Sequence, residues 1–312
     1  MRVAVVDIGT NSTRLLIADV DPASSAVEPL VRRSEVTRLG SGVDAAGSLS
    51  QEASERVFAT LSDYRAVIDA HHCTANLAVL TSAVRDAANG QAFAARVRAD
   101  YGLDARILSG DEEAQLGFLG AMSGRAVERE DTGEPTVVID VGGGSTEFVV
   151  GRGRSAGFHV SLPAGVVRMS ERHIHHDPPA PEELQELSLD VRETFLEGLP
   201  PEERAPVTRG IAVSGTATSA AGIDQELDPY DPERVHGYPL QLATIELLLA
   251  RLADMDEADR RRVVGLQPGR APTIVAGMIL LGEALRAFAL DEVEVSEHDI
   301  LYGGALRLAG CG

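Results

Sequence analysis

Two stretches of this chain are versions of one another, and this repeat limits the possible folds more than any other feature. Residues 7–14 read Asp-Ile-Gly-Thr-Asn-Ser-Thr-Arg and residues 140–147 read Asp-Val-Gly-Gly-Gly-Ser-Thr-Glu, so they align without a gap. Short apolar runs precede and follow each stretch, which predicts a strand, a tight polar turn and a second strand. One such hairpin in each half predicts a duplicated protein with its binding site between the halves.

The composition of both turns suits the binding of an anion such as phosphate. Glycines let the backbone approach a ligand closely, and the N–H groups of a turn can point at a negative charge. The first turn has Thr10 and Asn11 where the second has glycines, so we expect it to be stiffer and to offer side-chain donors. The predicted phosphate contacts are Gly9, Thr10, Asn11 and Ser12 in the first turn and Gly142, Gly143, Gly144, Ser145 and Thr146 in the second.

Charged residues flank the two turns at equivalent positions. Asp140 and Glu147 are expected to approach one another across the second hairpin, where two carboxylates would suit magnesium or manganese. Asp7 repeats the place of Asp140 and is placed to hold a metal or to order a water. Arg14 takes the place of Glu147 in the first stretch. We therefore expect the first half to bind phosphate and the second half to bind a metal. A polar hairpin with a solvated Glu147 is the simpler alternative.

The balance of charged residues argues against several kinds of ligand and protein. The formal net charge is −20, so non-specific binding of nucleic acid is not expected, and any phosphate site must be locally basic or hold a metal. The chain contains no lysine, which argues against a phosphate-loop NTPase, because that class depends on one. Codon bias in a GC-rich genome also explains this usage. In either case phosphate must be bound by arginine, backbone amides or a metal.

The hydropathy of the chain indicates a cytoplasmic protein. No apolar run approaches the roughly 18 residues of a membrane span. Residues 274–290 come closest, but Glu283 and Arg286 interrupt them. The first residues enter a strand directly and lack the layout of a signal peptide. We therefore expect a cytoplasmic location and no membrane partner.

Strands and helices alternate in both halves, which favours an α/β fold. A third strand is expected after each hairpin, at 28–38 and at 156–162, and the antiparallel hairpins make the sheets mixed. The charged segment 125–135 lacks apolar periodicity and is the expected domain boundary. Further strands are predicted at 77–80, 105–108, 211–213 and 293–295, and helices at 50–70, 91–101, 240–252, 272–289 and 299–308.

Two motifs outside the hairpins add charged candidates for the site. Ser109 and Glu112 have the spacing of a capping box, which explains Glu112 but leaves Glu113 without a capping role. Glu113 is therefore a candidate general base for an attacking water, with an ordinary acidic helix start as the alternative. Arg85 follows a buried strand, and a surface salt bridge is its alternative explanation.

A third motif, Ser214-Gly215-Thr216, precedes an alanine-rich helix. Backbone N–H groups at such a helix start form an anion site, so Gly215 and Thr216 are further candidates for phosphate binding. A simple helix cap explains the same residues equally well. The basic run 260–262 is interpreted as the solvated face of a helix.

Together these motifs resemble the exopolyphosphatase and guanosine pentaphosphate phosphohydrolase family, a branch of the actin, sugar kinase and heat-shock ATPase superfamily. The matching segments occur in the order of the family and cover nearly the whole chain. They are 7–12, 81–87, 109–114, 140–147, 161–168 and 214–218, with further matches at 269–271 and 295–299. Two residues depart from the pattern: Ser214 replaces a common glycine, and Pro272 replaces a frequent aspartate.

The resemblance implies a duplicated actin-like α/β fold with two domains hinged around a cleft. Domain I would cover 1–124, domain II would cover 125–297, and a closing helix at about 298–312 would pack back on domain I. Longer family members carry extra helical domains that retain long polyphosphate, so short chains or a nucleotide are the expected substrates here. A homodimer is also expected from the resemblance.

The implied reaction is magnesium-dependent removal of the terminal phosphate of inorganic polyphosphate, with manganese as a second candidate metal. The resemblance assigns catalysis to Glu113, metal binding to Asp140 and Glu147, and phosphate binding to Arg85. Guanosine pentaphosphate is the alternative substrate. A sugar or acetate kinase is a further alternative, against which the lack of lysine and the Glu113 motif argue. A non-catalytic sensor of polyphosphate or guanosine tetraphosphate is the last.

Overall fold

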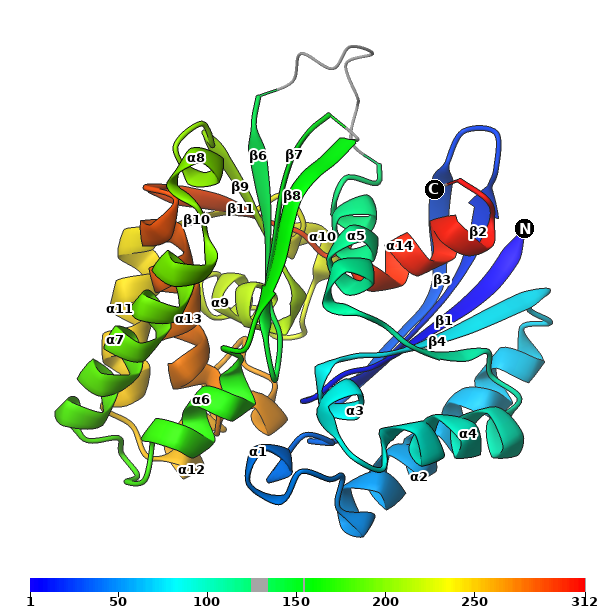
Figure 1. Ribbon diagram of the computed structural model, residues 1–312, viewed down its shortest axis with the longest axis horizontal. Helices are drawn as coiled ribbons and strands as arrows, with labels where there is room; N and C mark the ends of the chain where they lie inside the picture. Colours follow the sequence, from blue (N-terminus) through cyan, green and yellow to red (C-terminus); the bar gives the residue numbers. More distant parts are fainter. Residues whose placement is uncertain (125–133, 154, 312) are drawn as a thin grey trace. The chain divides into compact units, whose positions relative to one another are not determined.

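The computed structural model describes residues 1–124, 134–153 and 155–311 (Figure 1). The chain divides into two compact units. Unit 1 consists of Met1–Ala126 and His298–Gly312, and unit 2 consists of Val127–Glu297. The expected domain boundary at 125–135 falls largely on 125–133, which lie outside the described residues.

Unit 1 contains a five-stranded mixed sheet in the order β3-β2-β1-β4-β5. The first hairpin pairs β1 (Arg2–Ile8) with β2 (Thr13–Asp21), and β3 (Ala26–Glu35) continues the antiparallel part. Two parallel strands, β4 (Ala75–Leu80) and β5 (Ala105–Ile107), complete the sheet on the other side of β1. The hairpin therefore lies at the centre of the unit, with its turn at the end of β1.

Helices cover both faces of this sheet because β1 is apolar on both sides. Ala4, Val6 and Ile8 belong to the core under α2 (Gln51–Ala70) and α4 (Gly90–Tyr101). Val3 and Val5 alternate with them and pack toward α14 (Ile300–Leu308), which contacts α5 (Gly110–Ala121). Two short helices, α1 (Val43–Ala46) and α3 (Ser82–Asp86), lie in the connections. A helix from the far end of the sequence thus completes unit 1.

Unit 2 repeats this strand order in a six-stranded sheet, β10-β11-β9-β6-β7-β8. The second hairpin consists of β6 (Thr136–Val141) and β7 (Thr146–Arg152), followed by β8 (Ser155–Leu162). The parallel strands β9 (Arg209–Val213) and β11 (Glu292–Val295) take the places of β4 and β5. The added edge strand is β10 (Pro239–Gln241), antiparallel to β11. The duplication seen in the sequence is therefore a duplication of sheet topology.

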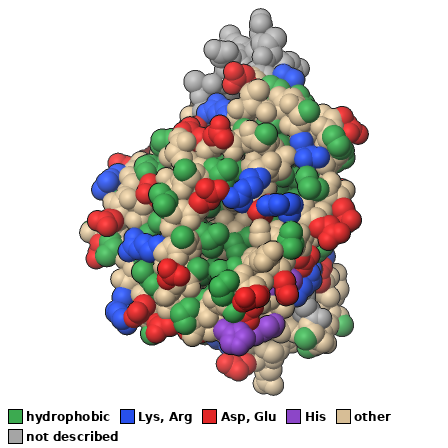
Figure 2. Space-filling view, turned by 90° about the vertical axis from the view of Figure 1, so that its left-hand side faces the viewer, with side chains coloured by type: hydrophobic (Ala, Val, Ile, Leu, Met, Phe, Trp, Pro, Cys, Tyr) green, Lys and Arg blue, Asp and Glu red, His purple; other side chains and the backbone are tan. Residues whose placement is uncertain are grey.

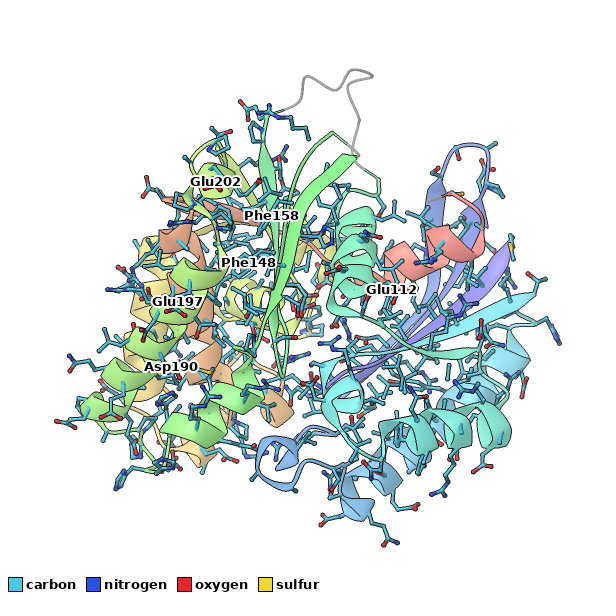
Figure 3. All side chains as sticks on the ribbon, viewed as in Figure 1. Glu112, Phe148, Phe158, Asp190, Glu197 and Glu202 are labelled. Atoms are coloured by element: carbon cyan, nitrogen blue, oxygen red, sulfur yellow. The ribbon has the colours of Figure 1, made fainter. Side chains whose placement is uncertain are left out.

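The largest core of unit 2 lies between the sheet and a layer of helices. Its central helix, α13 (Ile274–Ala287), contacts α7 (Pro181–Gly198) and α11 (Leu242–Ala253) (Figure 1). Phe148 of β7 points from the sheet toward these helices (Figure 3), and its ring centroid lies 5.0 Å from that of Phe195. The remaining helices are α6 (Val166–His173), α8 (Pro201–Arg204), α9 (Ser214–Asp224), α10 (Pro232–Val235), α12 (Glu257–Arg260) and the 3-10 turn Pro268–Arg270.

The α/β class and the mixed sheets are confirmed, but in unit 2 one strand was missed and one interpretation, of the run 260–262, was wrong. The three-residue strand β10 was not predicted, and the helix expected at 240–252 begins only at Leu242. Arg260 is only 4% exposed, although the run 260–262 was interpreted as a solvated face. Its guanidinium donates to Asp177 Oδ1 at 2.9 Å and to the backbone oxygens of Met255 and Ala271. These partners are distant in sequence, so the local charge pattern could not reveal them.

The acidic surface includes many ion pairs rather than one uniform negative face. Figure 2 shows the side of unit 2 that carries α7 and α11, where acidic and basic side chains are interspersed among hydrophobic ones. Arg172 pairs with Asp190 there, and Arg286 pairs with Glu246. Within the described part of the chain, none of the helices combines the length and the apolar character needed to cross a membrane.

Candidate active site

The second hairpin places two carboxylates next to each other. Asp140 on β6 is directly opposite Glu147 on β7 in the antiparallel register. Both lie on the sheet face opposite Val137, Ile139 and Phe148, because side chains alternate along a strand. Directly opposite residues have Cβ atoms about 4.5–5.5 Å apart. The two side chains can therefore act on one ligand, as expected from the sequence.

Two serine hydroxyls hold one oxygen of the buried Glu147. Ser145 in the turn donates to Glu147 Oε1 at 2.5 Å, and Ser161 of β8 donates to the same oxygen at 2.8 Å. The other oxygen, Oε2, lies toward the turn, 3.7 Å from where a Cβ on Gly142 would stand. Glu147 is only 4% exposed. The alternative of a solvated Glu147 on a polar hairpin is therefore wrong.

The start of α6 fixes the backbone of the glycine turn. The N–H of Val166 donates to Gly142 O at 2.9 Å, and the N–H of Val167 donates to Gly143 O at 2.8 Å. A Cβ on Gly165 would lie 2.5 Å from the carbonyl atoms of Gly143, so only glycine allows this approach. The N–H of Gly142 also donates to Ser145 O within the turn, at 3.0 Å. These bonds and those from α6 hold the turn in one conformation.

The first hairpin has the same register but a different pair of charges. Asp7 is directly opposite Arg14, whose Nε and Nη2 donate to Asp7 Oδ2 at 2.9 and 2.6 Å. Arg14 Nη1 also donates to Asp299, which caps α14 by accepting from the N–H of Leu301. Burial raises the pKa of Asp7, Arg14 opposes this shift, and the charge of Asp299 adds to it. One cation thus serves two buried carboxylates.

The turn of the first hairpin is fixed in the same way as the second. The N–H of Arg38 donates to Asn11 O at 2.8 Å, and the N–H of Gly40 donates to Thr10 O at 2.9 Å. Thr10 Oγ1 is 2.9 Å from the hydroxyl of Ser82, which begins α3. The buried Oδ1 atom of Asn11 and the Oδ1 atom of Asp7 have no hydrogen-bond partner among the described residues. The turn thus keeps side-chain acceptors as well as backbone groups.

The two charged candidates outside the hairpins of unit 1 contact each other. Arg85 on α3 donates from Nη1 to Glu113 Oε2 at 3.0 Å and to the carbonyl oxygen of Leu108 at 3.2 Å. Both side chains are partly buried. The predicted capping box of Ser109 and Glu112 is confirmed, and Glu112 is labelled on α5 in Figure 3. Glu113 is thus not needed to cap its helix, and Arg85 fixes the position of its carboxylate.

The start of α9 reveals an arginine that was absent from the predicted site. Ser214 and Gly215 begin α9, and a Cβ on Gly215 would lie 1.9 Å from Nη1 of Arg270. The guanidinium therefore lies directly against the first turn of the helix. A cation and a helix N-terminus both attract anions, so Arg270 joins Gly215 and Thr216 as a candidate phosphate contact. Its place in the Gly-Arg-Ala match at 269–271 was the only signal in the sequence.

The carboxylates of the described residues set the kind of metal site that is feasible. No group of three or more His, Cys, Asp and Glu side chains that could hold a metal occurs among the described residues. Asp140 and Glu147 form a pair, which suits magnesium because this ion keeps several waters and often uses only one or two carboxylates. Asp7 differs from the expected ligand, since its Oδ2 atom is bonded to Arg14.

The sequence matches a known family along almost its whole length. The model of the Ppx/GppA phosphatase family covers residues 16–307. This chain belongs to the Ppx/GppA phosphatase family. It is therefore a hydrolase by family. A relative in Mycobacterium tuberculosis, named Exopolyphosphatase 2, is 37% identical over 99% of both chains.

Solved structures of the Ppx/GppA family have the same fold. An exopolyphosphatase-like protein is 33% identical with a TM-score of 0.90, covering 98% of this chain and 97% of that one. The Aquifex aeolicus family member is 28% identical with a TM-score of 0.80, covering 99% and 97%. This likeness shows that the chain has the fold of the Ppx/GppA family, and the repeated strand order confirms the expected duplication.

Proposed function

We propose that this chain is an exopolyphosphatase that releases terminal orthophosphate from inorganic polyphosphate, with a preference for short chains. The observation that carries the proposal is the pairing of Asp140 with Glu147 beside a glycine turn whose backbone is fixed by α6. The two carboxylates can bind a metal, and the turn offers backbone N–H groups to phosphate oxygens. The name of the 37% identical relative supports the same substrate.

We assign the divalent cation, magnesium or manganese, to Asp140 and Glu147. The oxygen-only donor pair fits a hard cation that also takes waters and substrate phosphate. When bound, the ion supplies positive charge against the phosphate oxygens. The Oδ1 atom of Asp7, which is buried and has no hydrogen-bond partner among the described residues, is suited to accept a bond from a water molecule.

Binding of the phosphate chain is assigned to the two turns and to three arginines. The N–H groups of Gly9 and Gly142 donate within their own turns, to Ser12 O and Ser145 O. The other N–H groups of both turns would bind phosphate oxygens, together with Gly215 and Thr216 at the start of α9. Arginine can bind two oxygens of a phosphate at once, which suits Arg14, Arg85 and Arg270 in a chain without lysine. In phosphoryl transfer such positioning and charge neutralisation supply most of the catalysis.

Glu113 is assigned the role of general base. Its carboxylate would accept a proton from water as the water oxygen bonds to the terminal phosphorus. The bond from that phosphorus to the bridging oxygen breaks, so orthophosphate and a chain one phosphate shorter are released. The bond from Arg85 to Oε2 holds the carboxylate in one orientation for this transfer.

Replacing Glu113 by glutamine tests this assignment most directly. Phosphate release with magnesium should fall by about 10²–10⁴-fold, because the amide cannot accept the proton. Glu112→Gln is the matched control, since glutamine preserves a capping box and the residue has no proposed role in the reaction. Unchanged turnover in Glu113→Gln would remove this residue from the mechanism.

The same assay should compare short polyphosphate, long polyphosphate and guanosine pentaphosphate. Release only from the nucleotide would make the chain a guanosine pentaphosphate phosphohydrolase. Binding of polyphosphate or guanosine tetraphosphate without release would indicate a sensor. Adding guanosine tetraphosphate to the polyphosphate reaction tests inhibition by that nucleotide, and light scattering tests the proposed homodimer.

A further inference from the structure

One row of side chains crosses three strands of unit 2 next to the glycine turn. In the registers of the sheet, Asp140 of β6 is opposite Glu147 of β7, and Glu147 is opposite Ser161 of β8. Ser161 donates to Glu147 Oε1 at 2.8 Å. Ser145, within the turn itself, donates to the same oxygen at 2.5 Å. Ser161 is therefore a support that comes from outside the turn.

The first hairpin has the same row with a different outcome. Asp7 is opposite Arg14, and Arg14 is opposite Ser34 of β3. The hydroxyl oxygen of Ser34 is buried and makes no hydrogen bond within the described part of the chain. An arginine offers only donors, whereas a glutamate offers acceptors. The bond from Ser161 to Glu147 therefore has no counterpart in the first hairpin and is not a general requirement of the third strand.

The two hydroxyls also fix the orientation of the Glu147 carboxylate. Both bind Oε1, and Oε2 is the atom that faces Gly142 at the turn. A carboxylate held at one oxygen cannot rotate freely about its last bond. Outer hydrogen bonds of this kind commonly fix the orientation of a metal-binding carboxylate.

We propose that Ser161 is a positioning residue that aims Oε2 of Glu147 at the divalent cation. The inference rests on the proposed metal role of Glu147. Ser161 itself does not contact the ion or the substrate in this proposal; it acts through Glu147. Loss of its hydroxyl should therefore weaken metal binding while leaving the fold intact.

The experiment measures Mn²⁺ binding to the full chain by electron paramagnetic resonance, without substrate. Ser161→Ala should raise the dissociation constant about 10-fold or more, the usual effect of losing such an outer contact. Ser34→Ala is the matched control, because it removes the equivalent hydroxyl from the other hairpin and should leave Mn²⁺ binding unchanged. Ser161→Thr retains a hydroxyl and should restore most of the affinity.

The magnesium concentration for half-maximal phosphate release gives a second readout and should rise with the Mn²⁺ dissociation constant. Equal Mn²⁺ affinity in Ser161→Ala and the parent protein would overturn the proposal, and so would equal weakening by Ser161→Ala and Ser34→Ala. If Ser161→Ala does not fold, Ser161→Cys keeps the size with a weaker donor and should show an intermediate affinity. Unchanged Mn²⁺ binding in Glu147→Gln would instead refute the metal role of Glu147.

Discussion

The two hairpins share their backbone and differ in their charges. Each turn has its carbonyl oxygens bound by N–H groups of the segment that follows the third strand, and each has an aspartate at the end of its first strand. Opposite that aspartate stands Arg14 in one unit and Glu147 in the other. The duplicated part is therefore the frame of backbone hydrogen bonds around each turn. Under the proposed function, the charge at one position of that frame, Arg14 or Glu147, sets whether the hairpin binds phosphate or a metal.

A second contrast concerns how the units stabilise buried carboxylates. Arg14 alone is shared by Asp7 and Asp299, and burial raises the pKa of Asp7 despite that contact. In unit 2, Glu283 accepts bonds from Arg192, Arg286 and Ser188. Burial would raise the pKa of Glu283, but the bonds from Arg192 and Ser188 lower it overall. One arginine serves two carboxylates in unit 1, whereas two arginines serve one carboxylate in unit 2. This difference explains why the pKa is raised for Asp7 and lowered for Glu283.

The largest effect on stability is expected when Arg14 is replaced. Arg14→Gln would leave Asp7 and Asp299 buried without their shared cation, and the free energy of unfolding should fall by about 3–5 kcal/mol. Chemical denaturation measures this change. Arg14→Lys should recover part of the loss, because lysine keeps the charge but not the planar fork. If Arg14→Gln lowers the free energy of unfolding by less than Gly165→Ala does, Arg14 does not stabilise both carboxylates.

Two glycine variants test whether the frames of the hairpins are equally rigid. A Cβ on Gly165 meets backbone atoms of Gly143 at 2.5 Å, whereas a Cβ on Gly40 meets the methyl group of Thr10 at 2.1 Å. Backbone cannot yield as a side chain can, so Gly165→Ala should cost about 1–3 kcal/mol and Gly40→Ala less. Thermal unfolding of both variants checks the order. A larger loss for Gly40→Ala would show that the first frame is the stiffer one.

The smallest effect is expected at Glu283. Glu283→Gln should cost about 1 kcal/mol near neutral pH, because Arg192 and Arg286 are exposed enough to return to water. The lowered pKa of Glu283 means that its ionised form stabilises the fold above about pH 4.3, the ordinary value for glutamate. This contribution is lost as the pH falls through the lowered pKa. The free energies of unfolding of the parent protein and Glu283→Gln should therefore converge as the pH falls. A constant difference between them down to pH 2 would disprove the stabilising role of ionised Glu283.

Local patterns in the sequence predicted the elements well and their long-range contacts poorly. The hairpins, the third strands and the capping box of Ser109 depend on neighbours a few residues away, and the structure contains them. The contact of Arg85 with Glu113 spans 28 positions and that of Arg14 with Asp299 spans 285. Such pairs depend on which strands become adjacent, and residue periodicity does not encode this.

The same limit explains the errors at Arg260 and Arg270. A run of three arginines is usually solvated, but Asp177 and the carbonyl oxygen of Ala271 bury the first of them. Since Ala271 directly follows Arg270, this buried arginine also fastens the segment that lies against Gly215. No feature near either arginine in the sequence reveals these partners. Arg260 and the carbonyl oxygen of Ala271 meet only because α12 packs beside the end of the 3-10 turn Pro268–Arg270.

The return of α14 to unit 1 has a consequence for how the protein is made. The residues of unit 2 are contiguous in the chain, whereas unit 1 needs Asp299 and α14 from the far end. Domains generally fold as units while synthesis proceeds from the N-terminus. Unit 2 can therefore fold first on the ribosome, although the strands of unit 1 are translated earlier. Asp299 can reach Arg14 only after residues 127–297 of unit 2 have been synthesised, so unit 1 gains its second carboxylate at Arg14 after the chain of unit 2 is complete.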